Sequence, residues 1–241
     1  MSVKRLLNDV CDIIFPPQCL SCAENNLPAE GIFCSSCLEK IRFITGSLCP
    51  ICGIPFLNSP AEGHICGKCL ENNPYYTQAR SMASFETIIM EAIHKFKYGR
   101  NITIGDALGS CMAAFSFPDF DYSKYSLLIP VPLHIKRLRE RGFNQSLLLA
   151  QKLGKKYRLP VSFSLLKRRK FTLTQTGLNK KERGKNIKGA FAVLDRQKVS
   201  GKNIILIDDV YTTGATINEC AKVLLKAGAE QVAVLTLARV L

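Results

Sequence analysis

The sequence predicts an α/β protein with a mostly parallel sheet, preceded by a small cysteine-rich module at its N terminus. Three observations predict this class. Four CxxC pairs lie before residue 70, and apolar strand-like runs alternate with helical periodicities after it. The strand-like runs are apolar along their whole length, as in strands covered on both faces. We expect the cysteine-rich module at residues 1–72 and the α/β domain at residues 81–241.

Hydrophobic periodicity assigns the elements of the α/β part in order. Strands are apolar runs bounded by prolines or glycines, and helices have apolar residues three and four positions apart. Strands are expected at residues 81–87, 125–134, 161–168, 203–210 and 230–240, and helices at 88–99, 104–115, 144–157 and 217–228. Asn144 should cap the third helix, and Gly228 should close the fourth.

The composition excludes several classes of protein. The 241 residues are 47% hydrophobic and 22% charged, which is ordinary for a globular chain and unlike a disordered one. No apolar run approaches the ~18 residues that span a bilayer. Asp9 and Asp12 interrupt the apolar start, so neither a membrane span nor a secretory signal is expected. We therefore expect a cytoplasmic location.

The net charge of +14 is concentrated in one stretch. Residues 136–188 contain 17 lysines and arginines and two acids, so the rest of the chain is close to neutral. A uniformly basic protein would indicate general affinity for nucleic acid or membranes. One basic stretch indicates a site for a specific anionic ligand.

Eight of the eleven cysteines form the four CxxC pairs. Each pair places two thiolates on one tight turn, and two such turns facing each other supply the closed tetrahedral cage of a structural Zn²⁺ site. The pairs are Cys19/Cys22, Cys34/Cys37, Cys49/Cys52 and Cys66/Cys69. We expect two structural zinc ions. The short loops favour joining the first pair to the second and the third to the fourth, although an interleaved arrangement also satisfies the spacing.

Other interpretations of the cysteines and their neighbours stay open at this point. Disulfides suit a secreted chain, and a thioredoxin-like couple needs one CxxC instead of four. His64, two residues before Cys66, could replace a ligand, but we expect it in a surface loop. Cys11, Cys111 and Cys220 stand in apolar surroundings and should be small core residues.

The run IILIDDVYTTGAT, residues 204–216, carries the clearest chemical signal. A buried strand delivers two carboxylates, Asp208 and Asp209, and a loop rich in Thr and Gly then leads into a helix. In an open α/β sheet ligands bind at this edge, and a helix N terminus after a glycine favours phosphate. Two neighbouring buried acids need hydroxyl or cation partners. A sugar phosphate supplies hydroxyls for the acids and a phosphate for the loop.

This run closely resembles the phosphoribosyl pyrophosphate (PRPP) signature of type I phosphoribosyltransferases. The resemblance implies their fold, with Asp208 and Asp209 contacting the ribose hydroxyls. It implies that the 5′-phosphate lies on Thr212, Thr213, Gly214, Ala215 and Thr216. In purine-specific members an aspartate three positions after the acidic pair is the general base. Thr212 stands there in this chain, so a purine acceptor is not expected.

Three separated motifs make the chain similar to the competence protein ComF family, whose members are associated with DNA uptake in natural transformation. They are FPPQCLSC with the following cysteine pairs, PVPLHIKRLRERGFNQS, and KRRKFTLTQTGLNKKERGKNIKGAF. Together they span essentially the whole chain. The second motif corresponds to the family's pyrophosphate loop, which implies that Arg137, Arg139 and Arg141 neutralise a diphosphate together with Mg²⁺. The alternative for these arginines is a solvated helix face.

The resemblance also assigns the charged stretch at residues 168–188 to the flexible catalytic loop of the superfamily. Its candidate residues are Lys170, Gln175, Arg183 and Asn186, of which Lys170 and Arg183 join Asp208 and Asp209 as candidate catalytic residues. Simple surface exposure is the alternative for all four loop residues.

Three functions follow. The first is a phosphoribosyltransferase that uses Mg²⁺ and PRPP with an unknown acceptor. The second is a protein that binds single-stranded DNA during competence through its basic face, with the zinc module as a further candidate surface and competence-machinery proteins as further partners. Against it, stacking aromatics are sparse in that stretch, with Phe143, Tyr157 and Phe171 among the few, and the chain has no Trp. The third is a regulator that senses PRPP without turnover.

Overall fold

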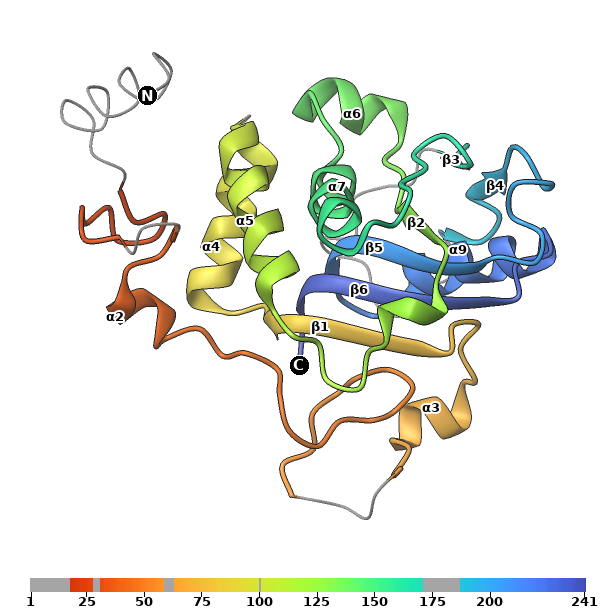
Figure 1. Ribbon diagram of the computed structural model, residues 1–241, viewed down its shortest axis with the longest axis horizontal. Coiled ribbons are helices and arrows are strands. Elements are labelled where there is room, and N and C mark those ends of the chain that lie inside the picture. The colour runs from red at the N-terminus through yellow and green to blue at the C-terminus, as the bar shows by residue number, and fades with distance from the viewer. Residues whose placement is uncertain (1–17, 28–30, 59–62, 100, 171–186) are drawn as a thin grey trace.

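A four-stranded parallel sheet forms the centre of the protein (Figure 1), as the sequence predicts. The computed structural model describes residues 18–27, 31–58, 63–99, 101–170 and 187–241. The sheet order is β1-β6-β5-β2, and all three strand pairs are parallel. The strands are β1 (Gln78–Ser84), β2 (Leu127–Pro130), β5 (Asn203–Tyr211) and β6 (Gln231–Arg239).

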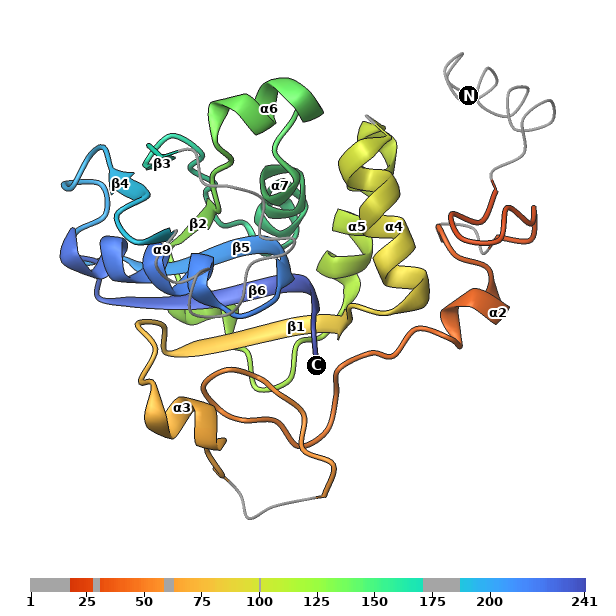
Figure 2. The same cartoon turned by 180° about the vertical axis from the view of Figure 1, so that it is seen from behind.

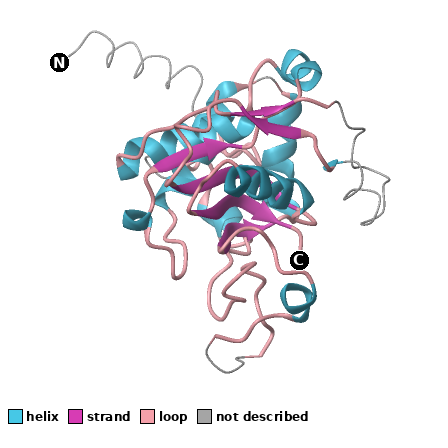
Figure 3. Ribbon diagram, turned by 90° about the vertical axis from the view of Figure 1, so that its right-hand side faces the viewer, coloured by secondary structure: helices cyan, strands magenta, loops and turns pink. Residues whose placement is uncertain are grey.

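Helices cover both sides of this sheet (Figure 3). Alternate residues of β5 divide between two cores, since Ile205 and Ile207 join one buried cluster and Ile204 and Leu206 the other. The first cluster contains side chains of three long helices and the second contains side chains of α9 (Ala215–Lys226). The three helices are α4 (Thr87–Tyr98), α5 (Ile102–Ala114) and α7 (Gln145–Tyr157). Burial on both faces explains why β2, β5 and β6 are largely apolar, whereas β1 also buries polar residues such as Arg80 and Ser81.

Several element ends follow from the expected signals. The Asn144 side chain caps α7 by accepting a hydrogen bond from the Ser146 backbone N–H at 3.1 Å. Gly99 ends α4, as predicted. Gly228, with φ of 100°, follows α9 and turns the chain into β6.

Other elements differ from the prediction. The strand expected at residues 81–87 is β1, which begins at Gln78 and ends at Ser84 because Thr87 already starts α4. The strand expected at residues 161–168 is reduced to β3 (Leu166–Arg168), since its antiparallel partner β4 (Phe191–Val193) is equally short. Periodicity missed β4 and α6 (Ile135–Arg141), because neither is long enough to show a repeat.

The two cysteine modules lie at different places on the α/β domain (Figures 1 and 2). The first, at residues 19–38, contains the short helix α2 (Ser35–Leu38) and lies beside α4. The second, at residues 49–71, contains α3 (Gly67–Glu71) and lies beside β1. A 3-10 turn, η1 (Tyr122–Lys124), precedes β2. No helix among those described is both long enough and apolar enough to cross a membrane.

Candidate functional site

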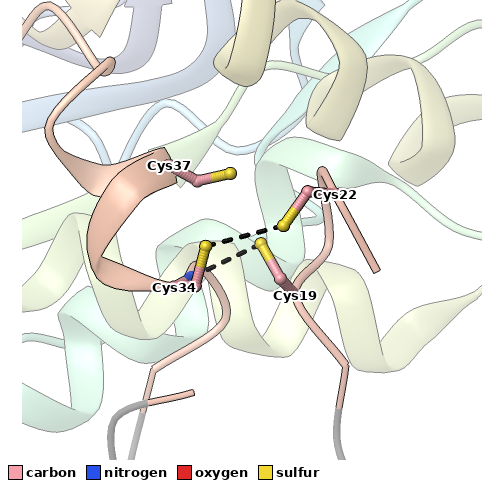
Figure 4. A group of neighbouring side chains, drawn as sticks. All are labelled: Cys19, Cys22, Cys34 and Cys37. Carbon is pink, nitrogen blue, oxygen red and sulfur yellow. Dashed lines mark hydrogen bonds between the residues drawn. The ribbon is translucent and has the colours of Figure 1, made fainter. Parts of the chain in front are cut away.

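Two cysteine tetrads have the geometry of closed zinc sites, and the first is drawn in Figure 4. Within each tetrad the four sulfur atoms lie within 4.8 Å of one another. The Cys22 and Cys34 sulfurs are 3.5 Å apart and the Cys52 and Cys66 sulfurs 3.6 Å. Tetrahedral Zn–S bonds place sulfurs about 3.8 Å apart. The tetrads are Cys19/Cys22/Cys34/Cys37 and Cys49/Cys52/Cys66/Cys69. They fit two structural zinc ions, and the sequential pairing is confirmed.

In each tetrad the backbone favours the thiolate form of the first cysteine. The Cys34 backbone N–H donates to the Cys19 sulfur at 3.4 Å. Burial opposes the effect, but backbone hydrogen bonds around Cys19 lower the pKa of its thiol to about 6. In the same way, N–H groups of Cys66 and Cys52 outweigh burial and lower the pKa of Cys49 to about 7. His64 is outside the second tetrad and packs edge-on against the Phe56 ring at 5.2 Å.

A polar cavity of about 170 Å³ lies at the C-terminal ends of β2 and β5. Asp208 and Asp209 reach it from the last part of β5. Four members of the predicted phosphate loop line it: Thr212, Gly214, Ala215 and Thr216. Thr213, the fifth member of the loop, lines a different cavity, which faces the second cysteine module. Arg137 and Arg141 of α6 line the polar cavity, whereas Arg139 is exposed and does not.

Each carboxylate of the pair has its own partner. The Ser146 hydroxyl donates to Asp208 at 2.9 Å, and the Lys97 ammonium pairs with Asp209 at 2.6 Å. Burial and the charge of Asp209 raise the pKa of Asp208 to about 7. Burial acts against ionisation of Asp209 too, but Lys97 outweighs it and holds the pKa of Asp209 below its usual value. The pair therefore carries less than two negative charges near neutral pH, which lowers the cost of placing two acids side by side.

The loop after the carboxylates needs glycine at position 214. Gly214 has φ of 79° and caps the N terminus of α9. A Cβ atom there would lie 2.4 Å from the Tyr211 hydroxyl oxygen. Only glycine therefore makes this turn without strain. The turn leads directly into the N terminus of α9, where free backbone N–H groups favour anions.

The cationic side of the cavity comes from several elements. The Arg141 guanidinium donates to the Gln145 amide oxygen at 3.1 Å and lies 5.7 Å from the centre of the Tyr98 ring. Arg168 of β3 and Lys97 of α4 also line the cavity. Three basic elements thus face the two carboxylates, which suits a ligand that carries both phosphate and hydroxyl groups.

The structure separates the predicted loop residues. Lys170 is exposed and does not line the polar cavity. Gln175, Arg183 and Asn186 lie outside the described residues. Their proposed roles in the catalytic loop remain predictions.

Three cavity residues escaped sequence analysis: Lys97, Ser146 and Arg168. Lys97 ends an amphipathic helix far from the acids in sequence, so nothing local marks it. Ser146 is the second residue of α7, and only its position next to the capping Asn144 could have indicated the edge of the sheet. Arg168 was one of four consecutive basic residues and could not be told from its exposed neighbours.

The fold, the tetrads and the cavity together define a double zinc ribbon followed by a phosphoribosyltransferase-type domain. Comparison with family models agrees. Residues 10–70 match the model of the double zinc ribbon domain, and residues 144–241 match that of the phosphoribosyl transferase domain.

The chain belongs to the competence protein ComF family. It is 31% identical to competence protein F of Haemophilus influenzae over 92% of this chain and 96% of that protein. It is also 31% identical to competence protein ComFC of Bacillus subtilis, over 94% of this chain and 91% of that protein. The DNA utilization protein YhgH of Escherichia coli K12 is 32% identical over 86% and 90% of the two chains.

Solved structures give only distant similarity. The glutamine PRPP amidotransferase of Bacillus subtilis is 19% identical, with a TM-score of 0.40 over 59% of this chain and 30% of that chain. A hypoxanthine phosphoribosyltransferase of Staphylococcus aureus is 14% identical, with a TM-score of 0.31 over 62% of this chain and 64% of that one. At this distance they carry no argument about the site.

Proposed function

We propose that the protein binds Mg²⁺–PRPP in the polar cavity and transfers its 5-phosphoribosyl group to an acceptor. One observation carries the proposal: a single cavity is lined by two partly buried carboxylates, by a helix N terminus with a Gly-Thr loop, and by guanidinium groups. Each feature alone has ordinary structural explanations. Their convergence matches the three parts of a phosphorylated sugar diphosphate.

The residues divide the ligand between them. Asp208 and Asp209 accept hydrogen bonds from the ribose 2′- and 3′-hydroxyls, while Ser146 and Lys97 orient the two carboxylates. The loop at residues 212–216 binds the 5′-phosphate through its N–H groups and hydroxyls. Arg137 and Arg141 face the diphosphate.

Transfer requires the bond between C1′ and the diphosphate oxygen to break, with its electron pair leaving on the diphosphate. The acceptor then forms the new bond to C1′ and loses its proton. Guanidinium groups at the diphosphate stabilise the departing charge. When bound, Mg²⁺ would add charge neutralisation at the same place. Thr212 offers no general base, so the acceptor must ionise readily or be deprotonated elsewhere.

Calorimetry with matched variants tests the binding site. Asp208→Asn combined with Asp209→Asn should weaken Mg²⁺–PRPP binding at least about tenfold, or roughly 1.4 kcal/mol, because amides lose the charge-assisted bonds to the ribose hydroxyls. Asp195→Asn is the control, since this carboxylate lies outside the cavity and caps backbone N–H groups that an amide oxygen also accepts. Unchanged affinity in a folded double variant would refute the site.

A measurement of pyrophosphate release distinguishes an enzyme from a regulator that only binds PRPP. A transferase given its acceptor liberates diphosphate with each turnover. PRPP binding that alters the affinity for a protein partner, without diphosphate release, would instead support a PRPP-sensing role. An enzyme and a PRPP-sensing regulator would use the same domain, so only a measurement of turnover distinguishes the two hypotheses.

Binding of single-stranded DNA is a second candidate function. Lys167, Arg169 and Lys170 are exposed and flank Arg168, which lines the cavity, and relatives of this chain carry the names competence protein and DNA utilization protein. We propose this exposed cluster as the surface for a DNA strand, with proteins of the competence machinery as further partners. Cysteines arranged for metal support a reducing, cytoplasmic location.

Salt dependence tests the DNA hypothesis. Changing Lys167 and Arg169 to alanine should flatten the log–log salt slope of oligonucleotide binding by about 1.4, since each lost phosphate contact removes roughly 0.7. Arg168 is left intact because it lines the polar cavity, and Lys170 because it is a candidate catalytic residue, so PRPP affinity should hardly change. A slope that stays the same while PRPP binding is lost would assign the cluster to the sugar phosphate. Saturating PRPP that displaces the oligonucleotide would show that the two sites overlap.

A further inference from the structure

The second cysteine module touches the predicted phosphate loop directly. The Lys68 ammonium, from α3 between Cys66 and Cys69, donates to the Thr213 backbone carbonyl at 3.3 Å. A cavity of about 170 Å³ lies between module and loop, lined by Cys69 on one side and Thr213 and Gly214 on the other. In the described part of the chain the first module packs instead with α4 and α5. Only one of the two zinc sites therefore adjoins the ligand loop.

Two buried arginines fix the second module to the sheet. Arg80 of β1, 2% exposed, donates to the carbonyls of Cys49 at 3.4 Å and Pro50 at 3.1 Å. Arg239 of β6, also 2% exposed, donates to the Cys52 carbonyl. Four thiolates around one Zn²⁺ carry a net charge of about −2. The zinc-loaded tetrad thus offsets the two guanidinium charges that lie against it.

The same contacts continue to the ligand loop. Arg239 lies over the Tyr211 ring at 4.8 Å, and the Tyr211 hydroxyl is 2.7 Å from that of Tyr76. That Tyr211 hydroxyl is the group against which Gly214 packs. The backbone N–H of Tyr75 also donates to the Asn218 side chain of α9 at 2.7 Å. Packed and hydrogen-bonded groups therefore run from the tetrad to both the loop and the start of α9.

We propose that the second zinc site and the loop at residues 212–216 form one cooperative unit, in which Lys68 is a positioning residue for the loop. The inference rests on the proposed function, because it takes PRPP as the ligand of the loop. Zinc at the second tetrad holds α3, and α3 holds the loop in its anion-binding shape. By linkage, PRPP must then raise the zinc affinity of the second tetrad by the same factor by which zinc raises PRPP affinity. The first tetrad is outside this coupling.

Lys68 has a second effect through the peptide group it contacts. A cation on the Thr213 carbonyl polarises the peptide bond between residues 213 and 214. The N–H of Gly214 becomes a stronger donor as a result, because hydrogen bonds in a chain reinforce one another. Loss of Lys68 should therefore weaken anion binding. It should not unfold the module, because the Lys68 side chain is exposed and its hydrogen bond to the loop lies at the surface.

Matched lysine variants test the role of Lys68. Lys68→Ala removes a lysine-to-carbonyl bond between the second module and the loop. Lys95→Ala removes a similar bond, from α4 to the Leu20 carbonyl of the first module at 2.5 Å. Calorimetry with Mg²⁺–PRPP should show about fivefold weaker binding for Lys68→Ala and unchanged binding for Lys95→Ala. Equal affinities for the two variants would overturn the role of Lys68.

Zinc competition tests the coupling. The full chain is titrated with a chromophoric zinc chelator with and without Mg²⁺–PRPP, and alkylation with mass spectrometry identifies which cysteines become free. PRPP should protect the second tetrad about fivefold or more and leave the first unchanged. The double variant Asp208→Asn/Asp209→Asn, given the same PRPP, corrects for zinc bound by PRPP itself. Calorimetric PRPP binding without any protection of the second tetrad would overturn the inference and spare the proposed function. Absence of PRPP binding to the wild type would overturn the proposed function itself.

Discussion

The two cysteine modules have the same local motif and different surroundings. In the first, Cys19, Cys34 and Cys37 belong to the buried cluster that includes Ile89 of α4. Its polar connections to α4, such as the bond between Ser21 and Glu91 at 3.4 Å, are exposed. The second module is joined to β1 and β6 by buried arginines and reaches the ligand loop.

The difference shows that the CxxC pairs fix the metal sites but not what those sites do. Backbone turns and thiols alone build each tetrad. What each module touches is decided by residues elsewhere, apolar helix faces for the first and charged strand residues for the second. The first module therefore adds to the hydrophobic core, whereas the second adjoins the ligand site.

The largest effect is expected from the arginine of β1. Arg80→Met should lower the free energy of unfolding by about 3 kcal/mol, because it leaves buried carbonyls of the second module without a donor. Arg42→Met, an exposed arginine that follows the first module, should change it by less than about 0.5 kcal/mol. Chemical denaturation measures both. Equal losses would break the distinction between the modules.

A smaller effect on stability is expected from alanine substitution at two glycines that have similar backbone angles. Gly53 and Gly46 have φ of 68° and 79°, so alanine is strained at both. At Gly53 a Cβ would lie 2.3 Å from the Ala79 carbonyl oxygen of β1, whereas at Gly46 nothing lies within 4 Å. Gly53→Ala should therefore cost about 2 kcal/mol more than Gly46→Ala. Thermal or chemical unfolding that shows no excess for Gly53→Ala would mean that the module is not held tightly to β1.

The smallest effect concerns the site beside the second module. Because the pKa of Asp208 is raised to about 7, the folded protein keeps a proton that the unfolded chain loses near pH 4. Its contribution to stability is complete below pH 4 and is lost as the pH rises to 7. Asp208→Asn should remove this slope and be more stable than wild type at pH 8, by on the order of 1 kcal/mol. Melting curves from pH 4 to 8 check this, and parallel profiles for the two proteins would contradict it.

Sequence patterns predicted the centre of the fold and the centre of the site. The strands and the loop at residues 212–216 are contiguous in the chain, so apolar runs and turn chemistry identify them. The tetrads were predictable for the same reason, since each CxxC turn is local. Arg141, which the sequence placed at a diphosphate, lines the polar cavity, and its role there remains a prediction.

The rest depends on contacts between distant segments. Lys97 reaches Asp209 only because α4 packs beside the end of β5, and no local signal reports that packing. Arg80 lies within β1 and Arg239 ends β6, and no local signal reports that both are buried beneath the second module. Arg139 and Arg141 differ by half a turn of α6, which only the helix itself reveals.

A crystal structure of the zinc-loaded protein with Mg²⁺–PRPP tests the central claim most directly. We predict the 5′-phosphate on residues 212–216, the ribose hydroxyls within hydrogen-bonding distance of Asp208 and Asp209, and the diphosphate toward Arg141. A sugar phosphate bound in the cavity beside Cys69, or elsewhere with the two carboxylates unoccupied, would contradict the account.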